Sequence, residues 1–386
     1  MDLSHTPSGL PKVNVLQNAW RKAMERVNAS PRLYQWSRRS PLTRWVTRQR
    51  TQALFDVMAG FVHSQVLLAC VRMDLFRQLQ HAPASLAHLA ERTGVNPAAL
   101  QRLLLSAVAL KLLEHRSHGR FGLGPLGVPL AMHPGIAAMV EHNDLLYGDM
   151  RDPLAFLQHA WQGGMADYWP YAHDEHAADT AQGEKFSDYS DLMAASQRFV
   201  GDEILATYPF AKHRCVLDVG AGKGRFACEL ARHAPQLEIQ LFDLPPVLAL
   251  AQAHIESQAL SHRMRLHPGS FLHDDLPTGA DLITLVRVAH DHPDDVVQAL
   301  LNKIHQALPE GGMLMLAEPM AQAPSDSPNA ATQTDAYFHF YLLAMGAGRL
   351  RTPEELMRLM VQAGFKKPRR LRNALPVHAQ ILCAQK

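Results

Sequence analysis

Residues 215–245, CVLDVGAGKGRFACELARHAPQLEIQLFDLP, decide the fold. A short apolar run ends in three glycines spaced as GxGxG (Gly220, Gly222 and Gly224), a helical stretch follows, and a second apolar run ends at Asp243. Glycines at the end of a strand allow a tight turn into a helix and let a ligand approach the backbone at the helix N-terminus. The stretch therefore predicts a strand–helix–strand unit that binds a small molecule.

The same alternation continues toward the C-terminus. Further apolar runs are MRLHPG, DLITLVRV and GMLMLAEP, and the helical stretches between the runs are Phe226–Ala234, Val247–Ala259 and Asp294–Leu308. Strands that alternate with helices form a parallel sheet covered on both faces, so the predicted class is α/β. After a helix at Pro353–Ala363, two terminal strands joined by a short link predict a hairpin and an antiparallel last strand.

Asp243 lies nineteen residues after Gly224, where a carboxylate can accept hydrogen bonds from both hydroxyls of a ribose. A dinucleotide fingerprint would have GxGxxG, but its last position is Arg225, which argues against a nicotinamide oxidoreductase. The loop and the acid together indicate an adenosine site without a pyrophosphate. The alternative is that Asp243 only caps the next helix beside Pro245. Asp218 either orients the loop amides or contacts a ligand amino group.

The segment Ser85–Glu114 has a helix-turn-helix pattern, with a capping serine, a turn at Gly94 and a second helix from Pro97 to Leu113. A short wing-like hairpin is expected at Arg120–Gly127. A winged-helix DNA-binding regulator is one interpretation. The second helix carries only Arg102 and Lys111 as basic residues, which are few for the phosphate contacts that dominate DNA affinity. We therefore expect a dimerisation role and no nucleic-acid partner.

The net charge of +2 hides an asymmetry, because residues 1–50 carry ten basic and two acidic side chains. Tryptophan and tyrosine lie among these arginines, at Trp20, Tyr34, Trp36 and Trp45. Anionic headgroups attract basic residues and Trp prefers the membrane interface, so this basic arm predicts peripheral membrane contact. The alternative is that the arm wraps the partner subunit.

Other features of the composition bear on the compartment. The four cysteines lie far apart without a CxxC pair, which argues against a disulfide framework or a cysteine zinc site and favours a reducing cytoplasm. We expect no secretory signal and no apolar run approaching a membrane span. The apolar segment Leu54–Leu79 predicts one or two buried helices.

The order of motifs LDVGAGKG, LFDLP, GSFLHDDLP, VRVAHDHPDD, LAEPM and GRLRTPEEL resembles the S-adenosylmethionine-dependent O-methyltransferases of the caffeic acid and acetylserotonin type. Over almost the whole chain this resemblance implies a Rossmann-like class I methyltransferase domain and a helical, winged-helix dimerisation domain in a homodimer. The expected division is a basic arm at 1–50, a dimerisation domain at 51–130, a helical substrate-lining region at 131–208 and the methyltransferase domain at 209–386.

The resemblance also implies the residues that bind the cofactor, S-adenosylmethionine. Gly220, Gly222 and Gly224 would contact its methionyl part, and Asp243, followed by Leu244, would hold the ribose. The family usually has an Asp where this chain has Ser270, so adenine contact would depend on Phe271 and a weaker hydroxyl bond. The remaining expected cofactor contacts are Asp218 and Arg287.

His290 occupies the position of the family's general base, and a neutral imidazole can accept the acceptor's proton. Asp291 would help to hold the loop, and Glu318 would orient the imidazole by accepting its other N–H. The second orienting glutamate of the family is replaced by Leu350. The acidic cluster from Asp291 to Asp295 is expected to be the polar start of a helix rather than a metal site.

Two longer stretches, SPRLYQWSRRSPLTRWVTRQRTQALFDVMAGFVHSQVLLACVRMDLF and YFHFYLLAMGAGRLRTPEEL, resemble the hydroxyneurosporene (demethylspheroidene) O-methyltransferases of carotenoid synthesis. This narrower resemblance implies an apolar acceptor with a tertiary hydroxyl; a phenol or polyketide is the alternative. The side chains expected to line the acceptor pocket are Phe186, Met193, Phe338, Tyr341, Leu342 and Met345. Helical aromatic and methionine stripes of this kind also occur as plain core.

Overall fold

A computed structural model describes residues 29–41, 43–159, 163–168, 200–322, 332–374 and 379–386, together with Asn18, Ala19, Lys22, Glu25 and Arg26. The chain divides into two compact units, residues 1–132 with 327–329, and residues 133–326 with 330–386. The finer four-part division expected from the sequence stays a prediction.

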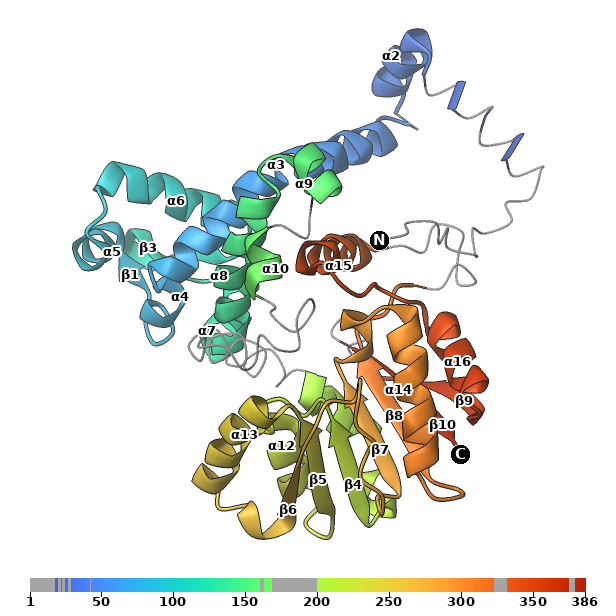
Figure 1. The fold of residues 1–386 in the computed structure, drawn as a ribbon. Coiled ribbons are helices and arrows are strands. Elements are labelled where there is room, and N and C mark those ends of the chain that lie inside the picture. Colours follow the sequence, from blue (N-terminus) through green and yellow to red (C-terminus); the bar gives the residue numbers. More distant parts are fainter. Residues whose placement is uncertain are drawn as a thin grey trace. The chain divides into compact units, whose positions relative to one another are not determined.

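The first unit is mainly helical (Figure 1). Its elements are α2 (Pro31–Arg39), α3 (Arg44–Arg72), α4 (Leu75–Gln78), β1 (Ala84–Ser85), α5 (Leu86–Thr93), α6 (Pro97–Ala109), β2 (Leu113–Arg116), β3 (Arg120–Leu123) and α7 (Gly127–Met132). The predicted caps are present, because Ser85 accepts from the main-chain N–H of His88 and Asn96 accepts from that of Ala98. Gly94 ends α5 in a left-handed conformation.

Two details of this unit differ from prediction. The second helix ends at Ala109 rather than Leu113, because the chain turns through Lys111 with a φ of +60° and then enters β2. The hairpin accordingly joins β2 to β3, with β1 on the far edge of a small antiparallel sheet, and residue 127 already begins α7. The winged-helix assignment stays a prediction.

The helix α3 corrects two expectations about the apolar segment. The first part of the segment Leu54–Leu79 is exposed in the single chain rather than buried; these side chains are Leu54, Phe55, Val57, Met58, Phe61 and Val62. Among the described residues α3 is also the one helix long and apolar enough to cross a membrane, although no such run was expected. Core helices of soluble proteins can have the same length and composition.

The second unit contains the predicted α/β sheet. Its strands are β4 (Cys215–Val219), β5 (Glu238–Asp243), β6 (Met264–Pro268), β7 (Leu282–Val286), β8 (Met313–Glu318), β9 (Lys366–Leu371) and β10 (Gln380–Gln385), in the order β6-β5-β4-β7-β8-β10-β9. The first five strands pair in parallel, and β10 pairs antiparallel with both β8 and β9. The fold class and the antiparallel last strand are therefore confirmed.

Helices cover both faces of this sheet (Figure 1). Those of one face are α12 (Arg225–His233) and α13 (Pro245–Ser257), and those of the other are α14 (Asp294–Ala307) and α16 (Pro353–Gln362). Adjacent strand residues serve opposite faces: Val216 packs with the first pair of helices and Leu217 with the second. Because both faces are buried, the strands are apolar runs and not alternating patterns.

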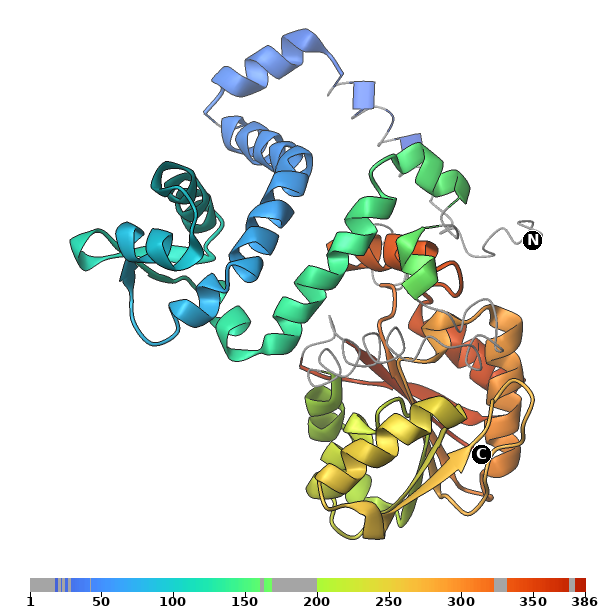
Figure 2. The same cartoon turned by 60° about the vertical axis from the view of Figure 1, so that its left-hand side comes forward.

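A further helical layer consists of α8 (Pro134–Asp149), α9 (Pro153–His159) and α10 (Gly164–Tyr168), which come before the sheet in the chain, and of α15 (Gln333–Met345), which lies between β8 and β9. Residues 200–207 are also helical and pack with α12 and α13. Figure 2 shows α15 beside α8, with which it is in contact. Their shared apolar cluster includes Leu146, Phe156, Met165 and Leu350.

Candidate active site

The predicted glycine loop lies between β4 and α12, at the carboxyl edge of the sheet. All three of its glycines have positive φ, and Gly220 has no room for a side chain, because a Cβ there would lie 2.6 Å from Val288 Cγ2. A Cβ on Gly222, in contrast, would meet nothing within 4 Å. The loop is thus tight against the protein at its start and open at its centre, as a ligand-binding loop requires.

Asp243 closes on this loop from the end of β5. Its carboxylate accepts from the main-chain N–H groups of Gly222 and Leu244, each at 2.7 Å. Burial raises the pKa of Asp243 to about 6, although both hydrogen bonds act to lower it. The N-cap of α13 is Leu244 and has no side-chain cap, so this acid does not cap the next helix in the usual way. Each carboxylate oxygen retains a lone pair for a further hydroxyl donor.

Asp218 is buried in β4 beside the loop. Its Oδ1 accepts from the Thr284 hydroxyl at 2.6 Å. Burial raises the pKa of this carboxyl to about 7, against the opposing effect of the Thr284 hydrogen bond. Of the two roles left open by the sequence, neither is performed by this contact, which joins β4 to β7.

The loop after β6 carries the residues expected near an adenine. The main-chain N–H of Ser270 donates to Asp274 Oδ2 at 2.8 Å. The ring of Phe271 packs edge-on against that of His292, with 5.2 Å between the ring centroids. Lys303 of α14 fixes the loop, because its ammonium donates to the carbonyls of Phe271, Leu272 and Asp274. The loop is therefore held from within and from the neighbouring helix.

His290 lies in a short 3₁₀ helix, Ala289–Asp291, directly after β7. Both ring nitrogens of this buried imidazole face carboxylates: Nε2 is 3.2 Å from Asp291 Oδ1, and Nδ1 is 3.5 Å from Glu318 Oε2. Burial lowers the pKa of His290, but the charges of Asp291 and Glu318 outweigh burial and raise it above its ordinary value. Burial also raises the pKa of Asp291, to about 6.

The geometry around Glu318 differs from the expected one. Its Oε2 accepts from the main-chain N–H of His290 at 3.1 Å, whereas the side-chain Nδ1 has no hydrogen-bond partner in the described part of the chain. Glu318 therefore holds the residue through the backbone and approaches the ring as a charge. Asp291, expected only to support the loop, instead faces the imidazole itself.

Arg287 precedes this helix in a left-handed conformation, with a φ of +57°. Its charge lowers the pKa of His290, of Asp291 and of Tyr337, although other effects on each group are larger. The Arg287 charge therefore acts on the imidazole and on the carboxylate beside it. Its predicted contact with the cofactor stays a prediction.

Four of the residues expected to line the acceptor pocket lie on α15, and their role stays a prediction. Tyr341, Leu342 and Met345 are buried and Phe338 is partly buried in the apolar cluster with α8, α9 and α10. Phe186 and Met193 lie outside the described residues. The cluster also contains polar pairs that the sequence analysis missed: His142 Nε2 lies 3.1 Å from the Tyr341 hydroxyl, and the Tyr337 hydroxyl donates to Asn143 at 2.9 Å.

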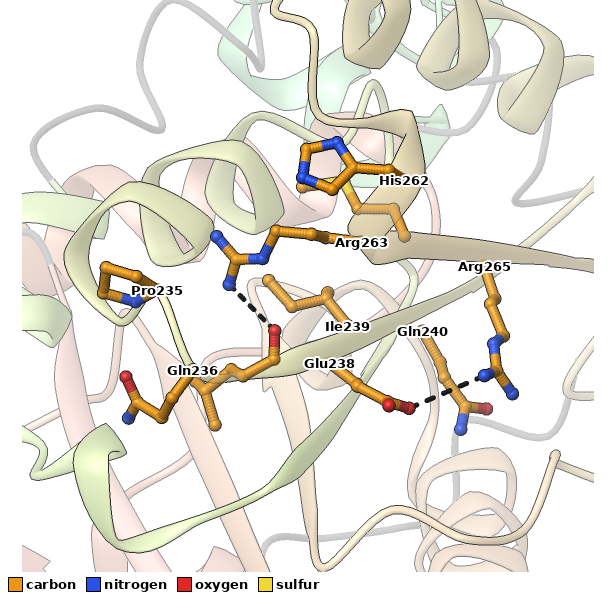
Figure 3. A pocket seen from close by; sticks show the side chains of 10 residues that line it. Pro235, Gln236, Glu238, Ile239, Gln240, His262, Arg263 and Arg265 are labelled. Carbon is orange, nitrogen blue, oxygen red and sulfur yellow. Dashed lines mark hydrogen bonds and ion pairs between the residues drawn. The ribbon is translucent and has the colours of Figure 1, made fainter.

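Two further points concern metal ligands and a second cavity. In the part of the chain that the structure describes, no group of three or more His, Cys, Asp or Glu side chains is arranged to hold a metal ion, and Asp294 and Asp295 form the first turn of α14. A polar cavity of about 340 Å³ lies at the opposite, amino edge of β5 and β6 (Figure 3).

Comparison with known proteins gives the family of this chain. Residues 155–366 match the O-methyltransferase domain and residues 55–132 the O-methyltransferase dimerisation domain. The demethylspheroidene O-methyltransferase of Rhodobacter capsulatus is 42% identical over 94% of this chain and 88% of its own length. The chain belongs to the O-methyltransferase family.

More distant relatives support the same family assignment. The acetylserotonin O-methyltransferase of Mus musculus is 30% identical over 86% of this chain and 87% of its own length. The crystal structure of human N-acetylserotonin methyltransferase in complex with SAM superposes with a TM-score of 0.71, at 23% identity, over 88% of this chain and 98% of that one. This O-methyltransferase uses S-adenosylmethionine, as its family does, and its dimerisation domain supports a homodimer.

Proposed function

We propose that this enzyme methylates a hydroxyl of an apolar acceptor, specifically the tertiary 1-hydroxyl of an acyclic carotenoid such as hydroxyneurosporene or demethylspheroidene. The 42% identity to a demethylspheroidene O-methyltransferase supports the acceptor class. The observation that carries the chemistry is His290, a buried imidazole placed between two carboxylates at the carboxyl edge of the sheet. Open α/β sheets bind their ligands at this edge.

S-adenosylmethionine supplies an electrophilic methyl group on a positively charged sulfur. The residues present fit this cofactor, because the open space above Gly222 adjoins a carboxylate with free lone pairs on Asp243. We infer that the three glycines contact its methionyl part and that Asp243 and Leu244 hold the ribose. The remaining inferred contacts are Asp218, Ser270, Phe271 and Arg287.

His290 acts as the general base. An acceptor hydroxyl that takes the place of Asp291 Oδ1 beside Nε2, now 3.2 Å away, gives its proton to Nε2, and the carboxylates of Asp291 and Glu318 then stabilise the imidazolium. Because the pKa of His290 lies above its ordinary value, the imidazole is a stronger base but is neutral only at higher pH. Turnover should therefore rise as pH increases through that pKa.

A tertiary alcohol is much less acidic than an imidazolium, so proton loss must accompany formation of the carbon–oxygen bond. Alignment of the reacting atoms can supply roughly 7 to 11 kcal/mol of the barrier reduction at best. The apolar wall on α15 provides a dry environment for this alignment. Leu350 belongs to the same wall, so the position of the family's second glutamate contributes apolar surface here.

The acceptor is tested by mass spectrometry after incubation with labelled S-adenosylmethionine and a panel of hydroxylated carotenoids, phenols and polyketides. Methylation of the 1-hydroxy carotenoids alone is expected. Labelling of phenols with no carotenoid product would reject the carotenoid assignment.

The base is tested with His290→Ala, which should lower kcat roughly a hundredfold or more while S-adenosylhomocysteine still binds. His305→Ala is the control, since this imidazole packs edge-on against Phe365 away from the site. Near-normal turnover in His290→Ala would exclude the imidazole as base.

We also propose a cytoplasmic enzyme that touches the membrane through the basic arm, where its acceptor is dissolved. Five exposed apolar side chains of α3 lie within residues 55–132, the dimerisation domain, so we assign these five to the partner subunit and the membrane contact to residues 1–50; they are Phe55, Val57, Met58, Phe61 and Val62. Deletion of residues 1–50 should abolish sedimentation with anionic liposomes. Unchanged sedimentation would refute the contact.

A further inference from the structure

A buried arginine holds the short helix that carries His290. Arg351 is completely buried, and its guanidinium donates to the carbonyl of Ala289 through Nη1 and to that of His292 through Nη2, both at 2.7 Å. The Nε atom donates to Asp294 Oδ1 at 2.8 Å. One planar group thus ties together the start of the 3₁₀ helix, the residue after it and the first turn of α14.

These contacts add donors to the carbonyls of a helix that has one main-chain hydrogen bond of its own, from the His292 N–H to the Ala289 carbonyl at 3.3 Å. The carbonyls of His290 and His292 have no donor inside this helix, and a buried carbonyl without a donor is destabilising. The fixed fork of a guanidinium can serve two carbonyls and a carboxylate at once. Asp294 supplies the opposite charge that a buried arginine needs.

The residues just before Arg351 also contact the backbone of the 3₁₀ helix. The main-chain N–H of Arg349 donates to the carbonyl of His290 at 3.0 Å. Gly348 lies so close that a Cβ would be 2.1 Å from the same carbonyl oxygen, and its φ is +77°. Segment 349–351 therefore binds the carbonyls of Ala289 and His290 in the 3₁₀ helix and that of His292 after it, from a part of the chain about sixty residues away.

We propose that Arg351 is a positioning residue for the base: it fixes the backbone of residues 289–292 so that the His290 imidazole stays between Asp291 and Glu318 and faces the acceptor. This inference rests on the proposed role of His290. The side chain of Arg351 acts through the backbone of its neighbours and touches neither acceptor nor cofactor.

The fork geometry explains why lysine should not replace this arginine fully. An ammonium is a single point that can restore the charge beside Asp294 but cannot reach both carbonyls in the same arrangement. Arg351→Lys should therefore recover part of the activity lost in Arg351→Met. We expect kcat to fall about tenfold in Arg351→Lys and about a hundredfold in Arg351→Met.

The chain offers a matched control in Arg263. Its guanidinium also binds three backbone carbonyls, those of Ala231, Ala234 and Leu237, at 2.7 to 3.0 Å. It lines the cavity at the amino edge of the sheet (Figure 3), whereas the candidate site lies at the carboxyl edge. Arg263→Met removes the same kind of contact without touching the helix of His290, so kcat should stay within twofold of the parent.

The deciding experiment is a double-mutant cycle of Arg351→Met with His290→Ala, measured as kcat with labelled methyl donor and as the Kd of S-adenosylhomocysteine. Expected are a large fall in kcat for Arg351→Met alone, no further fall when His290 is already alanine, and a Kd within threefold throughout. If Arg351→Met does not fold, two other variants replace it in the cycle. These are Arg351→Lys and Asp294→Asn, the second of which weakens the ion pair of Arg351 at its half-exposed carboxylate.

Three results are distinguishable. An equal fall in kcat with and without the imidazole would assign Arg351 a merely structural role and overturn the inference while leaving the base intact. Normal kcat in Arg351→Lys and Arg351→Met would overturn it as well. Near-normal kcat in His290→Ala would instead refute the proposed base, and the inference with it.

Discussion

Replacement of Asp218 by asparagine should stabilise this enzyme at alkaline pH. Asp218 is buried at the end of β4 with the Thr284 hydroxyl at 2.6 Å, and burial raises its pKa from 3.8 to about 7. The unfolded chain ionises this carboxyl near its ordinary pKa, but the folded chain resists ionisation. Stability is therefore lost as pH rises from 3.8 through 7.

The magnitude follows from the two pKa values. At about 1.4 kcal/mol per pKa unit, the folded state loses roughly 2 kcal/mol at pH 5 and roughly 4 kcal/mol at pH 8. An asparagine avoids this loss but leaves a buried NH₂ without an acceptor, at a cost of about 1–3 kcal/mol. The cost of the amide cancels when the two pH values are compared, so the variant should gain about 2–3 kcal/mol on the parent between pH 5 and pH 8.

The assay is urea unfolding of parent and Asp218→Asn at pH 5 and pH 8, without cofactor. Asp335→Asn is the control, because this buried carboxylate accepts main-chain N–H groups in the capping box of α15 and should lose stability at both pH values. Thr284→Val removes the one donor observed to Asp218 Oδ1 and should cost more at pH 8 than at pH 5. An Asp218→Asn variant with the same stability difference from the parent at both pH values would refute the reasoning.

Two further predictions concern the cofactor site and the helical layer. Asp243→Ala should raise the Kd of S-adenosylhomocysteine in calorimetry about a hundredfold, because charge-assisted hydrogen bonds contribute about 1.5–3 kcal/mol each; an unchanged Kd would contradict the ribose assignment. Burial lowers the pKa of His142 to about 4, so the parent should lose about 3 kcal/mol of stability as pH falls from 6.5 to 4. His142→Phe should flatten that loss in acid titrations followed by circular dichroism, and an unaltered slope would show that another group titrates.

Local sequence patterns predicted the strands of the sheet and the caps of the helices α5 and α6. The apolar runs become β4 to β8 because strands buried on both faces need no polar alternation, and Ser85 and Asn96 cap their helices through their own side chains. The end of α6 was placed too late because Leu110–Leu112 continue an apolar pattern while the backbone turns at Lys111. The face of α3 was placed in the core because sequence periodicity shows that a face is apolar, not what covers it.

The candidate site was predicted in its residues but not in its connections. His290 and Glu318 could be placed at strand ends, yet the main-chain hydrogen bond between them depends on how two loops meet. Arg351 follows the replaced glutamate position, and its carbonyl partners lie about sixty residues earlier. His142 and Tyr341 are about two hundred residues apart. Contacts of this range depend on the packing of whole elements, and no spacing in the sequence signals them.

The replacement of a second carboxylate by Leu350 fits the charges that remain. The imidazole already faces Asp291 and Glu318, and a third buried carboxylate would add desolvation cost and repulsion without a further ring nitrogen to pair with. For an acceptor whose proton leaves only during bond formation, a more basic imidazole is worth less than exact placement of the oxygen. Arg349 and Arg351 flank Leu350 and secure that placement through the backbone, so one short segment provides both the apolar surface and the rigid support.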